Sequence, residues 1–141
     1  MTIRIGFVGV GRMGANMARR LNDRGYKITA VQDQHAPAGE SLAKELSCEA
    51  ASSPSRVAEL SDIVLTVVTD DAAMDEIFSE TSPSSLLTHA KNRLFVNFAT
   101  VAPETHIKVE TLVERNGGTN LEALMASSIK QAREGTLYLM C

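Results

Sequence analysis

The sequence is poor in cysteine, in aromatic residues and in long apolar runs. Its 141 residues include two cysteines and no tryptophan, and 4% of them are aromatic. Cys48 and Cys141 have no CxxC spacing and are too few for a disulfide framework, so we expect a reducing compartment, the cytoplasm. The chain has no secretory leader pattern, and no apolar stretch reaches the roughly 20 residues that span a bilayer. We therefore expect no membrane partner.

The sequence also lacks a strong charge of either sign. Fourteen Lys and Arg stand against 17 Asp and Glu, which gives a net charge of −3, and the longest basic run is Arg19 with Arg20. Such a chain has no electrostatic footprint for nucleic acid, and we expect none as a partner. The balance of 44% hydrophobic and 22% charged residues is typical of a globular protein, and the length suits a single domain over residues 1–141.

Patterns for metal binding and for nucleophilic catalysis are missing as well. His35, His89 and His106 show no ligand spacing, so we expect them on the surface and expect no metal site. No serine stands in a GxSxG elbow, which gives hydrolase chemistry no support. We assign no catalytic residue.

What the sequence does contain is "IGFVGVGRMG" at 5–14, an apolar run that breaks into a GxGxxG glycine pattern. The run predicts a strand over 3–8, and apolar residues spaced by three and four predict a helix over 12–24. Gly25 is a suitable helix C-cap, and β-branched residues predict a second strand over 27–31. Strand, glycine turn, helix and strand form the unit in which this pattern binds dinucleotides.

The remaining chain alternates between predicted helices and strands. We expect helices over 37–47, 54–60, 70–78 and 103–115, and strands over 62–68, 93–99, 119–122 and, more strongly, 136–140. The continuous apolar runs at 62–68 and 93–99 are typical of parallel strands that are covered on both faces. The predicted fold class is α/β, a doubly wound parallel sheet with the Rossmann fold in a single domain.

The glycines have distinct predicted roles. Gly9 permits the tight turn, Gly11 lets a pyrophosphate approach the backbone, and Gly14 allows close helix packing. The helix that follows directs its N-terminal N–H groups at the phosphates, and Arg12 either pairs with a phosphate or lies in solvent. Asp33, 19 residues after Gly14, is placed to hold the ribose hydroxyls, which favours NAD over NADP; alternatively, it caps the turn.

Three more residues stand where parallel strands end. Val68 and Thr69 stand at the carboxyl end of one predicted strand and Thr100 at that of the next, so we expect them to line the nicotinamide half of the crevice. The alternative for the neighbouring Thr69 and Asp70 is that they cap a helix.

The whole chain resembles the β-hydroxyacid dehydrogenases, a family that includes 3-hydroxyisobutyrate dehydrogenase and, more distantly, 6-phosphogluconate dehydrogenase. The resemblance rests on four blocks in order, "IGFVGVGRMGANMARRLNDRGY", "SSPSRVAELSDIVLTVVTDDAAM", "NFATVAPET" and "LEALMASSIKQAREGTLYLM". It implies cofactor contacts from the glycine loop, Met13 included, from Val68 and Thr69, and from Thr100. It also implies hydride transfer between NAD or NADP and a small β-hydroxy acid, aldehyde or keto acid.

The resemblance further implies substrate contacts at Ser127 and Ser128, where family members hold the substrate carboxylate. Here two serines replace two glycines, and Ala126 replaces a serine. Family members also carry a catalytic lysine in a later, all-helical domain that binds substrate and forms dimers; no segment of this sequence matches that motif. We therefore expect a cofactor domain that is inactive alone, a small-molecule substrate, and a homo-oligomer at least in the full-length protein.

Two other interpretations stay open at this point. Imine reductases resemble the family in their nucleotide domain, and the altered "ALMASS" segment is compatible with them. A nucleotide-binding or protein-interaction module without catalysis is the other alternative.

Overall fold

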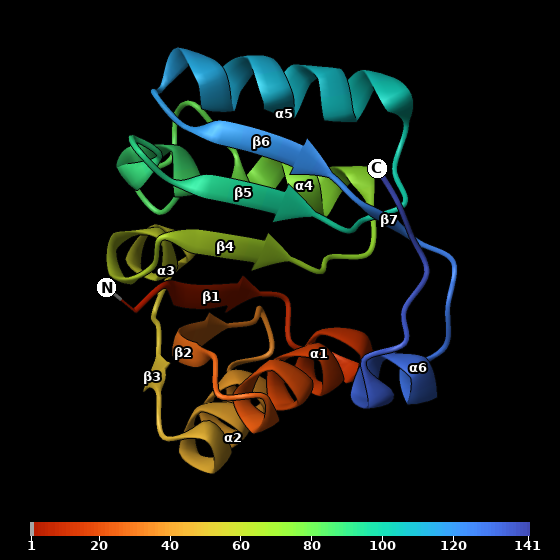
Figure 1. The fold of residues 1–141 in the computed structure, drawn as a ribbon. Coiled ribbons are helices and arrows are strands. Elements are labelled where there is room, and N and C mark those ends of the chain that lie inside the picture. Colours follow the sequence, from red (N-terminus) through yellow and green to blue (C-terminus); the bar gives the residue numbers. More distant parts are fainter. Residues whose placement is uncertain (1) are drawn as a thin grey trace.

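The computed structural model describes residues 2–141 as a six-stranded parallel sheet between layers of helices, with a short antiparallel pair beside it (Figure 1). The sheet has the order β3-β2-β1-β4-β5-β6. Its strands are β1 (Arg4–Val8), β2 (Lys27–Gln32), β3 (Glu49–Ala50), β4 (Ile63–Thr66), β5 (Leu94–Asn97) and β6 (Thr119–Glu122). The helices are α1 (Arg12–Asp23), α2 (Ala36–Leu46), α3 (Pro54–Leu60), α4 (Asp71–Ile77), the 3₁₀ helix η1 (Leu86–His89), α5 (Pro103–Arg115) and α6 (Ile129–Glu134). The predicted doubly wound sheet is confirmed.

The strand order creates a switch point at the centre of the sheet. β1 pairs in parallel with β2 on one side and with β4 on the other. The two halves of the sheet therefore extend from β1 in opposite directions. Ligands of open α/β sheets bind where such a reversal occurs, beyond the carboxyl ends of the strands. The turns that follow β1, β4 and β5 therefore meet at one edge of the molecule.

Local signals in the sequence account for several helix ends. The Ser53 hydroxyl accepts a hydrogen bond from Arg56 N–H at 3.3 Å and caps α3, whose first residue is Pro54. Asp70 caps α4 by accepting from Ala73 N–H at 2.8 Å, so the capping alternative for this residue is confirmed. Proline also begins α5, where its missing N–H costs no hydrogen bond.

Apolar side chains form a separate layer on each side of the sheet. On one side, α3, α4 and α5 pack over residues such as Val64 and Phe95, which are fully buried. Phe95 meets Phe78 edge to face, with ring centroids 5.6 Å apart. On the other side, α1 and α2 pack over residues of β1 and β2 such as Phe7 and Val31. Among residues 2–141, no helix combines the length and apolar character of a membrane span.

The last 20 residues differ most from expectation. The predicted strand over 136–140 is reduced to β8 (Leu139–Met140), which pairs antiparallel with the unpredicted β7 (Leu124–Met125), outside the main sheet. The unpredicted α6 between them packs against α1. Its start carries a capping box, in which the Ser128 hydroxyl accepts from Gln131 N–H and the Gln131 side chain accepts from Ser128 N–H. The Ser-x-x-Gln spacing is a sequence signal for this helix.

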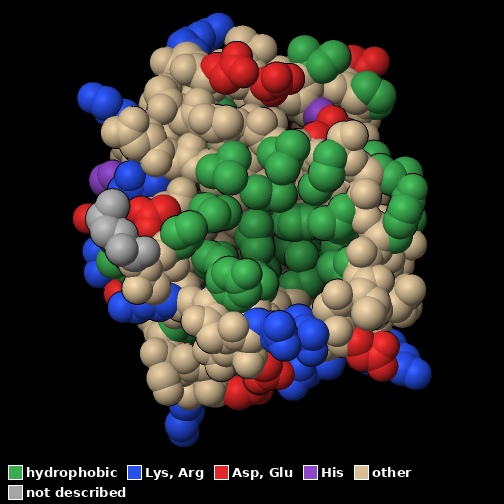
Figure 2. Space-filling model, viewed as in Figure 1, with side chains coloured by type: hydrophobic (Ala, Val, Ile, Leu, Met, Phe, Trp, Pro, Cys, Tyr) green, Lys and Arg blue, Asp and Glu red, His purple; other side chains and the backbone are tan. Residues whose placement is uncertain are grey.

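One part of the sheet is uncovered on the α1 side. Figure 2 shows apolar side chains gathered in a hollow at the middle of this face, over the sheet. A cavity of about 290 Å³ lies there, and its apolar lining is Met17, Leu21, Leu65, Phe98, Ala132, Leu137 and Leu139. Leu121 of β6 and Leu139 are 42% and 41% exposed. We call this surface, defined by the cavity lining together with Leu121, the open face.

Candidate functional site

The turn between β1 and α1 packs so closely against the start of α1 that one position of the turn and one position of the helix admit only glycine. Gly9 has φ +90°, and a Cβ there would lie 2.3 Å from the carbonyl oxygen of Val67. At Gly14, a Cβ would lie 2.1 Å from the carbonyl oxygen of Gly9. The first turn of α1 therefore packs directly onto the glycine turn and the end of β4, as the sequence predicted for close packing.

Gly11 differs from both, because the space beside it is open. A Cβ at this position would meet no atom within 4 Å. Gly11 is the N-cap of α1, and no side chain in the described part of the chain caps the helix. The N–H groups of a first helical turn have no partner within the helix and carry the positive end of its dipole. Here they stand beside open space, which is an arrangement that binds phosphate.

Asp33 connects the end of β2 to the glycine turn. Its Oδ2 accepts from Val10 N–H at 2.8 Å, and its Oδ1 accepts from His35 N–H at 2.9 Å. The Gly9 N–H donates to the Gln32 carbonyl at 2.9 Å, so the two turns are joined at two points. Asp33 thus has the turn-capping role that the sequence left open. Each carboxylate oxygen can accept a further hydrogen bond, so this role does not occupy the whole group.

Two cavities lie on either side of the glycine turn and share Gly11, Val67, Val68 and Thr69. The first, about 280 Å³, is also lined by Val8, Gly9, Gln32, Asp33, Gln34, Ala73 and Ile77. The second, about 310 Å³, is also lined by Arg12, Met13, Gly14, Phe98, Ala99, Thr100 and Met125. The structure therefore brings together all nine residues that the sequence assigned to a cofactor. The lining residues that were not predicted include Gln34, Phe98 and Met125. Gln34 lies beyond the end of β2 and Phe98 follows β5, and a position after a strand end is the signal that could have found them.

A network of hydrogen bonds holds the turns after β4 and β5 together. Asp71, at the start of α4, accepts from the Thr105 hydroxyl and from Ala102 N–H, the latter at 3.0 Å. These hydrogen bonds lower the pKa of the Asp71 carboxyl below its ordinary value of 3.8. Thr100, which lines the second cavity, lies in the turn that this carboxylate fixes.

The two serines assigned to substrate lie next to this site with their hydroxyls bound to backbone. Ser127 Oγ accepts from Tyr138 N–H at 2.7 Å, and Ser128 Oγ caps α6. Met125 is the residue of this segment that lines the second cavity. The segment thus reaches the cavity through Met125, and both serine hydroxyls stabilise the local fold.

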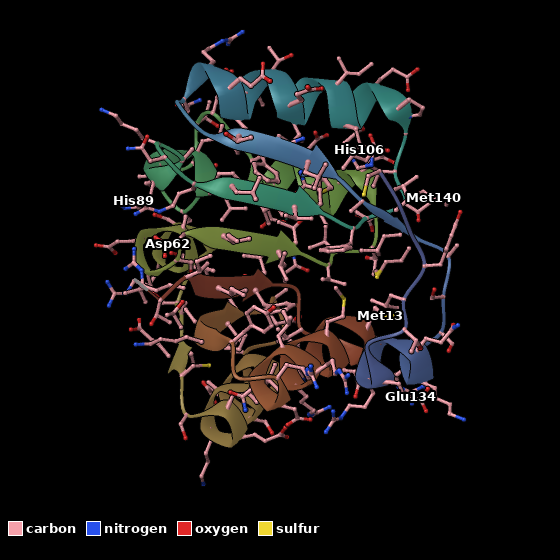
Figure 3. All side chains as sticks on the ribbon, in the orientation of Figure 1. Met13, Asp62, His89, His106, Glu134 and Met140 are labelled. Carbon is pink, nitrogen blue, oxygen red and sulfur yellow. The ribbon has the colours of Figure 1, made fainter. Side chains whose placement is uncertain are left out.

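The remaining titratable candidates lie mostly away from the cavities. His35 is exposed, and Lys130 is exposed on α6 with its Nζ 3.9 Å from Glu134, as a helix-surface residue would be. The surface prediction is wrong for His106, which is 4% exposed and lies beneath α5 (Figure 3). No group of three or more His, Cys, Asp or Glu side chains suited to a metal occurs within residues 2–141.

The fold and the glycine turn together are those of one class of nucleotide-binding domain. An uncapped helix N-terminus behind a glycine turn, between two cavities at the switch point of a parallel sheet, is the architecture of a Rossmann dinucleotide-binding domain. A family model described as the NAD binding domain of 6-phosphogluconate dehydrogenase matches residues 4–141. The chain belongs to this family, which confirms the predicted membership of the β-hydroxyacid dehydrogenases as their NAD-binding domain.

Individual relatives agree with this assignment. The mitochondrial 3-hydroxyisobutyrate dehydrogenase of Drosophila melanogaster is 30% identical over 136 residues, which cover 96% of this chain and 40% of the relative. The 3-hydroxyisobutyrate dehydrogenase of Mycobacterium tuberculosis, solved with L-serine, matches with a TM-score of 0.84 and 28% identity over 99% of this chain and 46% of its own. An imine reductase from Myxococcus stipitatus, solved with NAD+, shares the fold with a TM-score of 0.81 at 22% identity, over 93% of this chain and 43% of its own. The chain thus spans less than half the length of each of these relatives.

Proposed function

We propose that this chain is the cofactor-binding part of an oxidoreductase that transfers hydride between a nicotinamide cofactor and a small β-hydroxy acid, aldehyde or keto acid. The observation that carries the proposal is the uncapped N-terminus of α1 beside the open space at Gly11, where the two cavities meet. The nicotinamide supplies the hydride, and the protein holds and orients it.

In this proposal each cavity takes one half of the dinucleotide. The adenosine half occupies the first cavity, here called the Asp33 cavity. In domains with the GxGxxG pattern, the ribose lies at the acidic residue after the second strand. The pyrophosphate lies at Gly11, and the nicotinamide lies in the second cavity beside Thr100 and Met125. Val68 and Thr69 line both cavities and would contact the middle of the dinucleotide.

We propose NAD rather than NADP as the preferred cofactor. No lysine or arginine is among the residues that line the Asp33 cavity. Beyond Asp33, the Gln34 amide is bound at 3.0 Å to the Glu76 carboxylate, which adds a second negative charge near the ribose position. A 2′-phosphate would lie beside the Asp33 carboxylate, with no cation in the cavity lining and with Glu76 bonded to the lining residue Gln34. Asp33→Asn should therefore lower the ratio of the NADP dissociation constant to the NAD dissociation constant. Glu40 is exposed on α2 and outside the cavity lining, so Glu40→Gln should leave this ratio unchanged.

We further propose that this chain binds cofactor without completing turnover. No lysine lines either cavity in the part of the chain that the structure describes, so the proton donor for the substrate oxygen comes from elsewhere. The all-helical substrate and dimer domain that the family resemblance implies would pack on the open face, whose apolar side chains require a cover. In the absence of such a domain, the open face favours self-association, which size-exclusion chromatography can detect.

Calorimetric titration with NAD+, NADH, NADP+ and NADPH tests the binding part of the proposal. We expect one site per chain, tighter for the NAD pair. The absence of heat with all four at millimolar concentration would contradict it. Assays of the same sample with 3-hydroxy acids should show turnover at or near the background rate, and rapid turnover would contradict the incomplete active site.

A second candidate is an imine reductase, favoured by the bonding of Ser127 and Ser128. Neither serine is among the residues that line the second cavity, and both hydroxyl oxygens accept from backbone N–H groups of their own segment, those of Tyr138 and Gln131. A substrate without a carboxylate would not need them. Assaying the full-length enzyme with a cyclic imine and with a β-hydroxy acid separates the two candidates by which compound is consumed.

We propose the cytoplasm as the compartment, on the evidence of the cysteines. Cys48 and Cys141 are both free cysteines, as is usual in a reducing compartment. Expressing a tagged full-length protein and locating it by microscopy tests this point directly, since the relative from Drosophila melanogaster is named as mitochondrial.

A further inference from the structure

His106 is a buried polar side chain that the site described so far does not use. It lies in the second turn of α5 and is 4% exposed. Its Nε2 lies 3.1 Å from the carbonyl oxygen of Ala99, the residue that precedes Thr100. Figure 3 shows His106 beneath α5, near the carboxyl end of β6. The ring therefore contacts the turn that forms one wall of the second cavity.

The hydrogen bonding of the ring determines what it contributes. A carbonyl oxygen only accepts, so Nε2 carries a hydrogen and donates it to Ala99. Nδ1 is buried and has no hydrogen-bond partner among residues 2–141. Glu122 Oε1 is 3.7 Å from Nε2, which is too long for a hydrogen bond. An apolar ring would fill the same space without leaving Nδ1 unpartnered, so the contact that a histidine adds here is the bond to Ala99.

This bond completes the fixation of the turn between β5 and α5. At the far end of the turn, the Asp71 carboxylate holds Ala102 N–H and the Thr105 hydroxyl. At the near end, His106 holds the Ala99 carbonyl. Ala99 and Thr100 both line the second cavity, between these two anchors. Loss of the histidine anchor would free the end of the turn that lies nearest the cavity.

We propose that His106 is a positioning residue for the nicotinamide half of the cofactor. Through its bond to Ala99, it sets the position of Thr100 at the cavity wall. The Asp33 cavity lies on the other side of the glycine turn and contains neither Ala99 nor Thr100. His106 therefore affects the binding of nicotinamide and leaves the binding of the adenosine half unchanged. This inference rests on the proposed function.

The test compares NAD+ with ADP-ribose, which lacks the nicotinamide, by calorimetry. His106→Phe keeps the ring shape and removes the donor, so NAD+ should bind about tenfold more weakly, as expected for one hydrogen bond. ADP-ribose should bind within about twofold of wild type. His106→Gln, which restores an N–H donor, should recover most of the affinity for NAD+. His89→Phe, on η1, is the matched control and should change neither ligand.

The outcomes separate the inference from the proposed function. Equal weakening of both ligands by His106→Phe would show a merely structural role and overturn the inference, as would unchanged binding of NAD+. If wild type binds neither ligand, the proposed function fails and the inference fails with it. Should His106→Phe not fold, His106→Asn takes its place, because its amide is too short to reach the Ala99 carbonyl.

Discussion

The glycine turn and the open face are opposite in construction, although they lie on the same sheet. In the turn, Gly9 and Gly14 leave no room for a Cβ, and Asp33 bonds to the backbone of Val10. On the open face, Leu121 and Leu139 keep more than two-fifths of their surface exposed. The turn is closed by contacts within this chain, whereas the open face has no cover within residues 2–141 (Figure 2).

The difference between the two regions separates cofactor binding from substrate binding. In the proposed function, the groups that hold the dinucleotide, from the helix N-terminus to the walls of the two cavities, come from this chain. The segment assigned to the substrate differs, because its two serine hydroxyls accept from backbone N–H groups and the apolar surface beside it is exposed. Changes in the turn should therefore affect folding and binding of the isolated chain, and changes at the exposed side chains of the open face, Leu121 and Leu139, should affect mainly its association.

The largest effect is expected at Gly14. Alanine usually favours a helix over glycine by about 1 kcal/mol. At Gly14, however, the added Cβ would lie 2.1 Å from the Gly9 carbonyl oxygen, so Gly14→Ala should lower the free energy of unfolding by about 1–3 kcal/mol and abolish cofactor binding. Urea denaturation measures the first and calorimetry the second. Stabilisation of the chain by this substitution would contradict the close packing of the turn.

Gly11→Ala is the matched control for Gly14→Ala, with a smaller and different effect. Because the new Cβ meets nothing within 4 Å, the free energy of unfolding should change by less than about 0.5 kcal/mol. The methyl group would occupy the space in which the pyrophosphate approaches, so the dissociation constant for NAD+ should rise about tenfold or more. Unchanged affinity for NAD+ would show that the pyrophosphate does not bind at Gly11.

Leu121→Ser should have a modest effect on stability and a clear effect on association. With 42% of its surface exposed, Leu121 still buries more than half of it, so the free energy of unfolding should fall by about 1 kcal/mol. Self-association measured by sedimentation should weaken. Ile107→Ser removes a side chain that is 62% exposed from α5, outside the open face, and should leave association unchanged. Equal effects of the two variants on self-association would show that the open face is not the surface through which the chains associate.

The smallest effect is a pH dependence from Asp71. Its folded pKa lies below the ordinary value of 3.8, because Thr105 and Ala102 donate to the charged form. The carboxylate therefore adds stability above about pH 4, and this stability is lost as the pH falls through the lowered folded pKa. Asp71→Asn should flatten the decline of the melting temperature with acid. An identical acid profile for wild type and variant would show that the contact is absent in solution.

The sequence predicted the glycine turn well and the final segment poorly, for a physical reason. The turn depends on local rules, namely which residues tolerate positive φ and which begin a helix, and these rules placed α1 and α5 within a residue of their true ends. The "TLYLM" run has the composition of a strand, yet only Leu139–Met140 pairs, because its partner is the two-residue β7 rather than the main sheet. Pairing between distant residues is not encoded in a short window.

His106 illustrates the same limit at the level of one side chain. Its position on α5 follows from the sequence, but its burial depends on how α5 lies against β5 and β6. Likewise, the position of Asp33 after β2 was predictable, while its bond to Val10 N–H required the structure. Residue types and spacing predict which turns form the site, and tertiary packing decides which atoms face the ligand.

Titration of the ¹⁵N-labelled chain with NAD+, followed by amide chemical shifts, shows whether a dinucleotide binds across the glycine turn. We expect shifts at Gly11 and Met13, at Asp33, at Thr69 and at Thr100, on both sides of the turn. A surface groove between α4 and α5, about 490 Å³ and lined by residues such as Asp75 and Lys108, is the internal comparison and should show none. Shifts confined to that groove, or no shifts at millimolar NAD+, would show that the glycine turn is not a dinucleotide site.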